Sequence, residues 1–265
     1  MSEGAIHHPT ADAFEPPLFG AYSKKVGMWL FLLSDSLTFG ALLFAYSYGR
    51  IATHGWPTPF GAHSVANASV MTACLLSSSL TMVLAVLAAR RGDRTWRLNW
   101  LLATMVFGIA FIVLHAMEWN GLIREGMRLA IFPVPPGAEE GAAVGKMVES
   151  VPQFAATFFG LTGMHMLHVT IGVVYLGIIA LGRKFIPILL VLWLVAWQAT
   201  PVHSVFHNGS HVLLACAIIA GVVVFFKPKK YDEQDVEVSG LYWHFVDLVW
   251  MFIFPLVYLM STKVQ

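Results

Sequence analysis

The stretch YWHFVDLVWMFIFPLVY, residues 242–258, is apolar enough to lie in a lipid bilayer, yet it contains His244 and Asp247. An ionisable side chain at the centre of a bilayer costs roughly 2.5–3.5 kcal/mol on insertion scales, so such residues are rare without a role. The two residues are three positions apart and therefore share one face of a helix. The stretch predicts a membrane-spanning helix whose polar face is turned toward other helices.

The composition of the whole chain predicts an integral membrane protein. Of its 265 residues, 57% are hydrophobic and 12% are charged, and the mean hydropathy is +0.70. A soluble domain typically carries about twice that share of charged residues. The net charge of +1 gives no indication of a nucleic-acid partner. Cys74 and Cys216 lie in apolar runs and predict neither a disulfide framework nor a metal site.

Five apolar stretches are long enough for a membrane span, which takes about 20 residues. They cover residues 26–48, 66–89, 98–120, 154–181 and 241–260. Gly182, followed by Arg183 and Lys184, predicts a clean end for the fourth span. The polar residues 1–24 lack the features of a cleaved signal, so we expect the first span to direct insertion. By the positive-inside rule, four basic segments lie in the cytoplasm, at 24–25, 90–97, 183–184 and 227–230.

Residues 184–230 contain two further apolar runs, 185–199 and 211–226, on either side of a polar segment. Because both ends of this region are basic, an even number of crossings should separate them, and we expect an inserted helical hairpin. Its first arm is short: fifteen residues reach only about 22 Å of a roughly 30 Å hydrocarbon core, so it re-enters or thins the bilayer. The predicted fold is an all-α, polytopic transmembrane bundle of seven spans within a single membrane domain, residues 1–265. Its N-terminus is expected in the cytoplasm and its C-terminus in the periplasm.

The five clear spans contain several ionisable residues that we take as candidate functional or structural positions. They are Asp35, His115, Glu118, His165, His168, His244 and Asp247. Six of them form pairs spaced by three, and a carboxylate beside an imidazole can share a hydrogen bond rather than stay alone in hydrocarbon. We favour contacts that hold helices together, while a proton relay and axial ligation of a haem stay open. No cysteine pair suits a copper centre and no catalytic motif occurs, so we expect no catalytic, cofactor-binding or metal-binding residue.

A second candidate set lies in the expected hairpin, where His203, His207 and His211 recur every four residues. Two neighbouring imidazoles at this spacing can hold zinc or copper. No Cys, Asp or Glu lies nearby to complete a tetrahedral site, so we favour a stripe of helix or subunit contacts. On that interpretation, 184–230 docks a further small subunit or a supercomplex partner.

Four stretches resemble, in this order, motifs of subunit III of the haem–copper terminal oxidases. They are GMWLFLLSDSLTF (27–39), AMEW (116–119), ATFFGLTGMHMLHVTIG (156–172) and YWHFVDLVWMFIFP (242–255). The resemblance covers the five clear spans and their loops. The longer members of the family begin with two further helices, so the chain is similar to the five-helix bacterial form. Residues 26–183 then hold family helices one to four, 184–230 the added hairpin, and 231–265 the last helix.

The resemblance implies a non-catalytic core subunit of a proton-pumping terminal oxidase, in the bacterial inner membrane beside subunits I and II. Such a subunit carries no redox centre: the haems and copper belong to its partners, while it holds phospholipid, supports proton uptake and stabilises the catalytic subunit. Asp35 stands where most members carry glutamate. The other ionisable residues match positions usually read as internal helix contacts, and we expect His244 and Asp247 to face the bundle interior, near the fourth span.

Other functions stay open on the sequence alone. Within the same family, the chain could be an accessory subunit of a quinol oxidase or a nitric oxide reductase. From other classes we keep a proton-coupled transporter, which more often shows inverted repeats and broken helices, and a membrane cytochrome b, which would show a Soret band. The sequence names neither the electron donor nor the haem types, and it does not say whether Asp35 conducts protons or only stabilises the fold.

Overall fold

The computed structural model describes residues 23–124, 127, 151–182 and 231–261, and each element in these ranges is helical. The elements in chain order are α1 (Ser23–Ala52), α2 (Ala62–Arg90), α3 (Arg94–Arg124), α5 (Pro152–Leu181), α8 (Glu233–Ile253) and the π-helix η5 (Phe254–Leu259). The five α-helices, the last extended by η5, are long and apolar enough to cross a membrane. The five clear spans predicted from the sequence are confirmed as helices. The expected hairpin, and with it the count of seven, lies outside the described residues.

Helix α8 begins before the predicted apolar stretch because polar residues cap its start. Asp232 accepts from the backbone N–H of Asp235, whose side chain accepts from the Asp232 N–H, and this capping box begins α8 well before the apolar stretch. At the C-terminal end of α5, Gly182 has a φ of +56° and its N–H bonds to Ile178 O. A left-handed φ suits glycine, so the predicted end of the fourth span is confirmed.

The turn between α2 and α3 is very short, and two residues make it possible. Gly92 has a φ of +73°, and its N–H bonds to Ala89 O at 3.0 Å. Asp93 then caps α3, since its Oδ1 accepts from the N–H groups of Thr95 and Trp96, both at 3.1 Å. The two helices therefore run antiparallel and pack against each other along their length.

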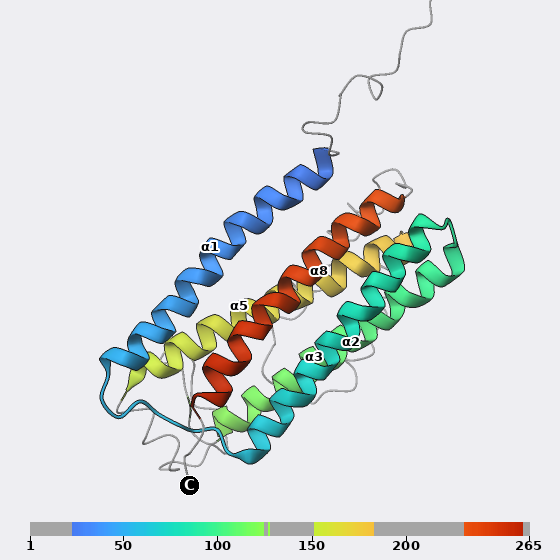
Figure 1. Ribbon diagram of the computed structural model, residues 1–265. Coiled ribbons are helices and arrows are strands. Elements are labelled where there is room, and N and C mark those ends of the chain that lie inside the picture. Colours follow the sequence, from blue (N-terminus) through green and yellow to red (C-terminus); the bar gives the residue numbers. More distant parts are fainter. Residues whose placement is uncertain (1–22, 125–126, 128–150, 183–230, 262–265) are drawn as a thin grey trace, which may run out of the picture.

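Helix α8 lies inside the bundle, between α1 on one side and the α2–α3 pair on the other (Figure 1). It packs on α1, α2 and α5, while α3 packs on α2 and α5. Helix α1 lies at the edge, where it touches α5 and α8. Helices α1 and α8 begin at the same end of the bundle, because Lys24 contacts Asp235. Residues 183–230 lie between α5 and α8, outside the described part of the chain.

The core is centred on Trp243 of α8, whose side chain is almost fully buried. Its indole N–H donates to Ser78 Oγ of α2 at 2.9 Å. A Cβ placed on Gly108 of α3 would lie 2.6 Å from the Trp243 ring, and one on Gly172 of α5 would lie 2.9 Å from it. The two glycines therefore let three helices close around one indole ring.

Candidate functional site

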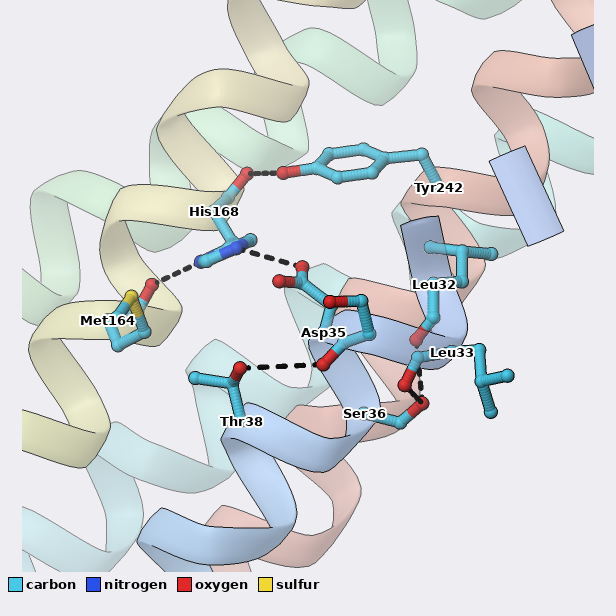
Figure 2. A network of polar contacts seen from close by, with 9 residues as sticks. Leu32, Leu33, Asp35, Ser36, Thr38, Met164, His168 and Tyr242 are labelled. Carbon is cyan, nitrogen blue, oxygen red and sulfur yellow. Dashed lines mark hydrogen bonds and ion pairs between the residues drawn. The ribbon is translucent and has the colours of Figure 1, made fainter. Parts of the chain in front are cut away.

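Asp35 of α1 and His168 of α5 form a close contact between two ionisable groups on different helices. His168 Nε2 lies 2.9 Å from Asp35 Oδ2, and both side chains are largely buried, with exposed fractions of 11% and 16%. Figure 2 shows the carboxylate of α1 pointing at the imidazole of α5. The sequence analysis selected both residues but did not pair them.

The other ring nitrogen of His168 determines where protons lie in this contact. Nδ1 is 2.8 Å from the backbone oxygen of Met164, and a carbonyl oxygen can only accept, so Nδ1 carries a hydrogen. In a neutral imidazole, Nε2 would then be an acceptor facing another acceptor, the Asp35 carboxylate. The contact is favourable only when Nε2 or the Asp35 carboxyl group carries one further proton. The pair is therefore an imidazolium with a carboxylate, or an imidazole with a carboxylic acid.

Aromatic side chains surround this pair and shield it from lipid. The ring of Phe39 meets the His168 ring edge to face, with centroids 5.1 Å apart. Tyr242 of α8 donates its hydroxyl to the His168 backbone oxygen at 3.0 Å. The pair thus lies where α1, α5 and α8 meet, and Figure 2 shows Tyr242 on the far side of His168 from Met164. A low-polarity surrounding strengthens an electrostatic contact of this kind.

His115 of α3 and His165 of α5 lie in a cluster of aromatic rings between these two helices and α8. Both side chains are fully buried, and neither ring nitrogen of either residue has a hydrogen-bond partner among the described residues. The His165 ring stacks on Trp250 with centroids 5.2 Å apart, and the His115 ring stacks on Phe111 at 5.6 Å. These histidines act as packed aromatic rings in this part of the chain. His165 and His168 share a helix and both contact Phe39, but it is His168 that lies beside Asp35.

Glu118 finds its partner on another helix rather than three residues away. Asn67 of α2 donates its side-chain amide to Glu118 Oε2. His115 makes no hydrogen bond with Glu118 among the described residues, although the two share a face of α3. Two residues three positions apart on one helix point outward side by side, so their side chains meet the facing helix rather than each other. Asn67 of the facing helix α2 is thus placed to reach the Glu118 carboxylate.

His244 and Asp247 do not bond to each other either, and both lie beside α2. The Nδ1 atom of His244 is 2.7 Å from Ser79 Oγ, and the same hydroxyl also lies beside Asp247. Asp247 is buried, as expected, and His244 is half-buried. The contacts seen for both residues are with Ser79 of α2, the second span, and their expected position near the fourth span stays a prediction.

The remaining expectations from the sequence concern metal ligands. His203, His207 and His211 fall in residues 183–230, outside the described residues. Elsewhere in the bundle, the described residues bring no three His, Cys, Asp or Glu side chains together as a metal-holding group.

Several contact residues were missed by sequence reasoning, which considered only ionisable residues inside apolar stretches. Ser79 and Asn67 bond to His244 and Glu118. Their position as uncharged polar residues within the apolar helix α2 was the feature of the sequence that could have indicated these contacts. At the end where α1 begins, Lys24 and Lys25 bond to Asp235 and Glu237 of α8 at 2.8 and 2.7 Å. At the opposite end, Arg50 bonds to Ser261 Oγ at 2.8 Å and to the Met260 backbone oxygen, and Tyr46 bonds to Ser261 at 2.9 Å.

Comparison with known proteins shows which family this bundle is similar to. The family model described as cytochrome c oxidase subunit III matches residues 20–123, which span α1 to α3. Cytochrome c oxidase subunit 3 of Alkalihalophilus pseudofirmus is 27% identical over 261 residues, covering 98% of this chain and 96% of the relative. These matches support the subunit III family of the haem–copper oxidases as the family that this chain resembles.

Other subunit III relatives differ in the oxidase to which they belong. Cytochrome bo(3) ubiquinol oxidase subunit 3 of Pseudomonas aeruginosa is 29% identical over 236 residues, 89% of this chain and 84% of the relative. The haem-copper oxidase subunit I+III of Aeropyrum pernix is 24% identical over 241 residues, which are 89% of this chain and 22% of the relative. Subunit III proteins of both cytochrome c and quinol oxidases are thus similar to this chain.

Proposed function

We propose that this chain is the non-catalytic subunit III of a haem–copper terminal oxidase in a bacterial inner membrane. The observation that carries the proposal is the similarity to oxidase subunit 3 over nearly the whole length of both chains. The enzyme would transfer electrons to oxygen and translocate protons, with its haems and copper in partner subunits. The relatives include subunits of cytochrome c oxidases and of quinol oxidases. The experiment below therefore tests both cytochrome c and a quinol as the electron donor.

The partners on this proposal are oxidase subunits I and II. The Aeropyrum pernix relative is named as subunits I and III in one protein, and this supports direct contact of this chain with subunit I. Residues 184–230 would dock a further small subunit or a supercomplex partner, with His203, His207 and His211 as the contact stripe. This part of the proposal rests on the sequence alone.

The Asp35–His168 contact would keep a proton inside the bundle and join α1 to α5. Its geometry supports this role, because the Met164 oxygen fixes the hydrogen on Nδ1 and Nε2 lies 2.9 Å from the Asp35 carboxyl group. A site that holds one proton in a buried setting suits a subunit that supports proton uptake and long turnover. The remaining buried polar residues, Glu118 and Asp247 among them, would hold helices together.

Phospholipid is the third proposed partner, and a hollow between α1 and α8 supports it. The hollow has a volume of about 330 Å³, and its walls are mostly apolar, with Ser36 and His244 as the polar exceptions. Trp29, Leu33 and Leu248 line it and are exposed on the outside of the bundle. These walls fit a lipid acyl chain.

Purification of the tagged full chain from its native membrane tests the proposal. We expect subunits I and II to co-purify, together with the visible spectrum of haem and with oxygen consumption driven by reduced cytochrome c or by a quinol. The same preparation decides between the two donors. A chain that purifies alone and itself shows a Soret band would be a cytochrome, and one that purifies alone without haem would leave the transporter as the better explanation.

A further inference from the structure

A second hollow lies at the corner where α2 ends and α3 begins. It has a volume of about 320 Å³ and combines charged, aromatic and aliphatic walls, contributed by Leu84, Leu87, Ala88, Arg91, Asp93, Trp96 and Trp100. The two tryptophan rings lie one turn apart on α3 and stack, with centroids 5.9 Å apart. None of these residues belongs to the polar contacts described for the site above.

The charges at this end of the bundle are not evenly balanced. The acidic start of α8 engages Lys24, Lys25 and the side chain of Arg90, which lies 3.3 Å from Glu237. Arg91, the next residue, has no acidic partner among the described residues, and it lines the hollow instead. Arg94 and Arg97 add two further positive charges to the same corner, also without an ion pair in the described part of the chain.

The one acidic wall residue is already used by the protein. Asp93 Oδ1 accepts from two backbone N–H groups at the start of α3. Its charge is therefore directed at the helix end, where a carboxylate is favourable, rather than left to neutralise Arg91. The hollow keeps an excess of positive charge.

The apolar walls place this corner at the boundary between lipid and water. Trp96 and Leu87 are exposed at 55% and 40%, and exposed Leu80 and Val83 continue the apolar surface along α2 toward the membrane interior. Tryptophan prefers the headgroup level of a bilayer, where its ring lies in apolar surroundings and its N–H meets polar groups. The positive charge of Arg91 therefore lies at the depth where lipid phosphates are found.

We propose that the α2–α3 corner binds an anionic phospholipid, with its phosphate at Arg91 and an acyl chain along Leu87, Val83 and Leu80. The arginine fork matches phosphate oxygens, and an indole N–H is a further donor at the same level. A positive hollow that continues into an exposed apolar surface fits a molecule that is charged at one end and aliphatic at the other. Free phosphate would leave the apolar track unused. The site does not depend on the proposed oxidase function.

Photo-crosslinking of the full chain in its purified complex tests this site. The complex is placed in phosphatidylcholine nanodiscs that contain a trace of either photoactivatable phosphatidylglycerol or photoactivatable phosphatidylcholine. After irradiation, lipid adducts on residues 84–100 are quantified by mass spectrometry. We expect labelling by the anionic analogue to exceed that by the zwitterionic one by about fivefold, the factor that one basic residue near a membrane surface supplies.

Two variants separate a built site from general surface charge. Arg91→Gln should reduce the preference for the anionic analogue about fivefold. Arg94→Gln makes the same change in net charge but alters a residue that does not line the hollow, so it should lower the preference clearly less than Arg91→Gln does. Arg91→Lys should keep much of it. An excess of inorganic phosphate should not compete, because it lacks the acyl chain.

Equal labelling by the two lipid analogues in the unaltered chain would overturn the proposal even if a variant fails to assemble. Equal losses in Arg91→Gln and Arg94→Gln would reduce the effect to general surface charge and overturn the site. Competition by inorganic phosphate would show a simple anion site, and a protein crosslink at 84–100 in place of lipid would show a subunit interface. Either result would contradict lipid binding.

Discussion

Helices α1 and α8 run parallel to each other through the bundle, yet they are held in place in different ways. Helix α8 buries twelve of its 21 residues, among them Trp243 and Trp250. Helix α1, which has 30 residues, buries Leu32, Phe39 and Tyr46 alone within the described structure. Close packing on several sides positions α8, whereas α1 has little such packing.

Polar contacts at three levels hold α1 instead. Its first turn bonds to the acidic start of α8, Asp35 meets His168 in the middle, and Arg50 and Tyr46 meet Ser261 near its end. In lipid, apolar faces gain little free energy from meeting each other, so close packing and hydrogen bonds decide which helices associate. In this bundle close packing holds α8 in place, and polar contacts hold α1.

The largest effect is expected where α8 depends on packing. Gly108→Ala places a Cβ within 2.6 Å of the Trp243 ring, which is buried and hydrogen-bonded and therefore cannot move aside easily. We expect a loss of about 3 kcal/mol in the free energy of unfolding, as for severe overpacking of a core. The thermal stability of the purified complex in detergent measures it. Gly121→Ala, on the same helix with open space around it, is the matched control and should be neutral or slightly stabilising.

The second effect concerns the middle contact of α1. Asp35→Ala leaves His168 Nε2 without its partner in a buried setting, at a cost of about 2 kcal/mol. We expect electron transfer to continue, while the oxidase loses activity sooner during turnover, as followed by oxygen consumption over time. Asp35→Asn should be milder, because the amide can donate to a neutral imidazole. A turnover lifetime in Asp35→Ala equal to that of the unaltered protein would argue against the role of this contact.

A smaller effect is expected at Asp247, where α8 uses a polar contact in addition to packing. Asp247→Leu removes the acceptor beside Ser79 and should loosen the bundle by about 1–2 kcal/mol, whereas Asp247→Asn keeps a hydrogen-bonding group. Retention of the subunit in the complex during detergent extraction measures the difference. Equal retention of both variants would show that the carboxylate has no part in holding α8.

The smallest effect is expected at the first turn of α1. The Lys25–Glu237 ion pair is partly exposed, with side-chain exposures of 34% and 27%, so Lys25→Gln should cost less than about 1 kcal/mol. A double-mutant cycle with Glu237→Gln isolates the pair, and its coupling should fall as salt is added. A coupling that is larger than that of Asp35 with His168 would reverse the order of the three levels.

The sequence predicts the helices well because each signal is local. Twenty apolar residues, a glycine at 182 and basic residues at the ends determine where a span lies without reference to the rest of the chain. The partners of the buried polar groups are not local. Asp35 and His168 are 133 positions apart, and Ser79 meets a histidine 165 positions away, so helix packing decides both contacts.

The same limit explains why the spacing of three did not name the partners of these residues. Spacing along a helix shows which residues share a face, but it does not show what lies opposite that face. His165 packs among aromatic rings and Glu118 bonds to Asn67, because α3, α5 and α2 bring those residues near. Prediction from the sequence alone therefore selected buried polar residues without naming the partner of each one on another helix.

The fixed hydrogen on His168 Nδ1 has a consequence for the electrical behaviour of the subunit. Whether the shared proton lies nearer to His168 or to Asp35, the pair as a whole carries no net charge, so the membrane voltage does little work on it. Removal of that proton would leave one full negative charge about 18 Å along α1 from its first residue. Moving one elementary charge across a membrane potential of about 100 mV involves about 2.3 kcal/mol. The contact between α1 and α5 would therefore respond to voltage only when its proton is lost.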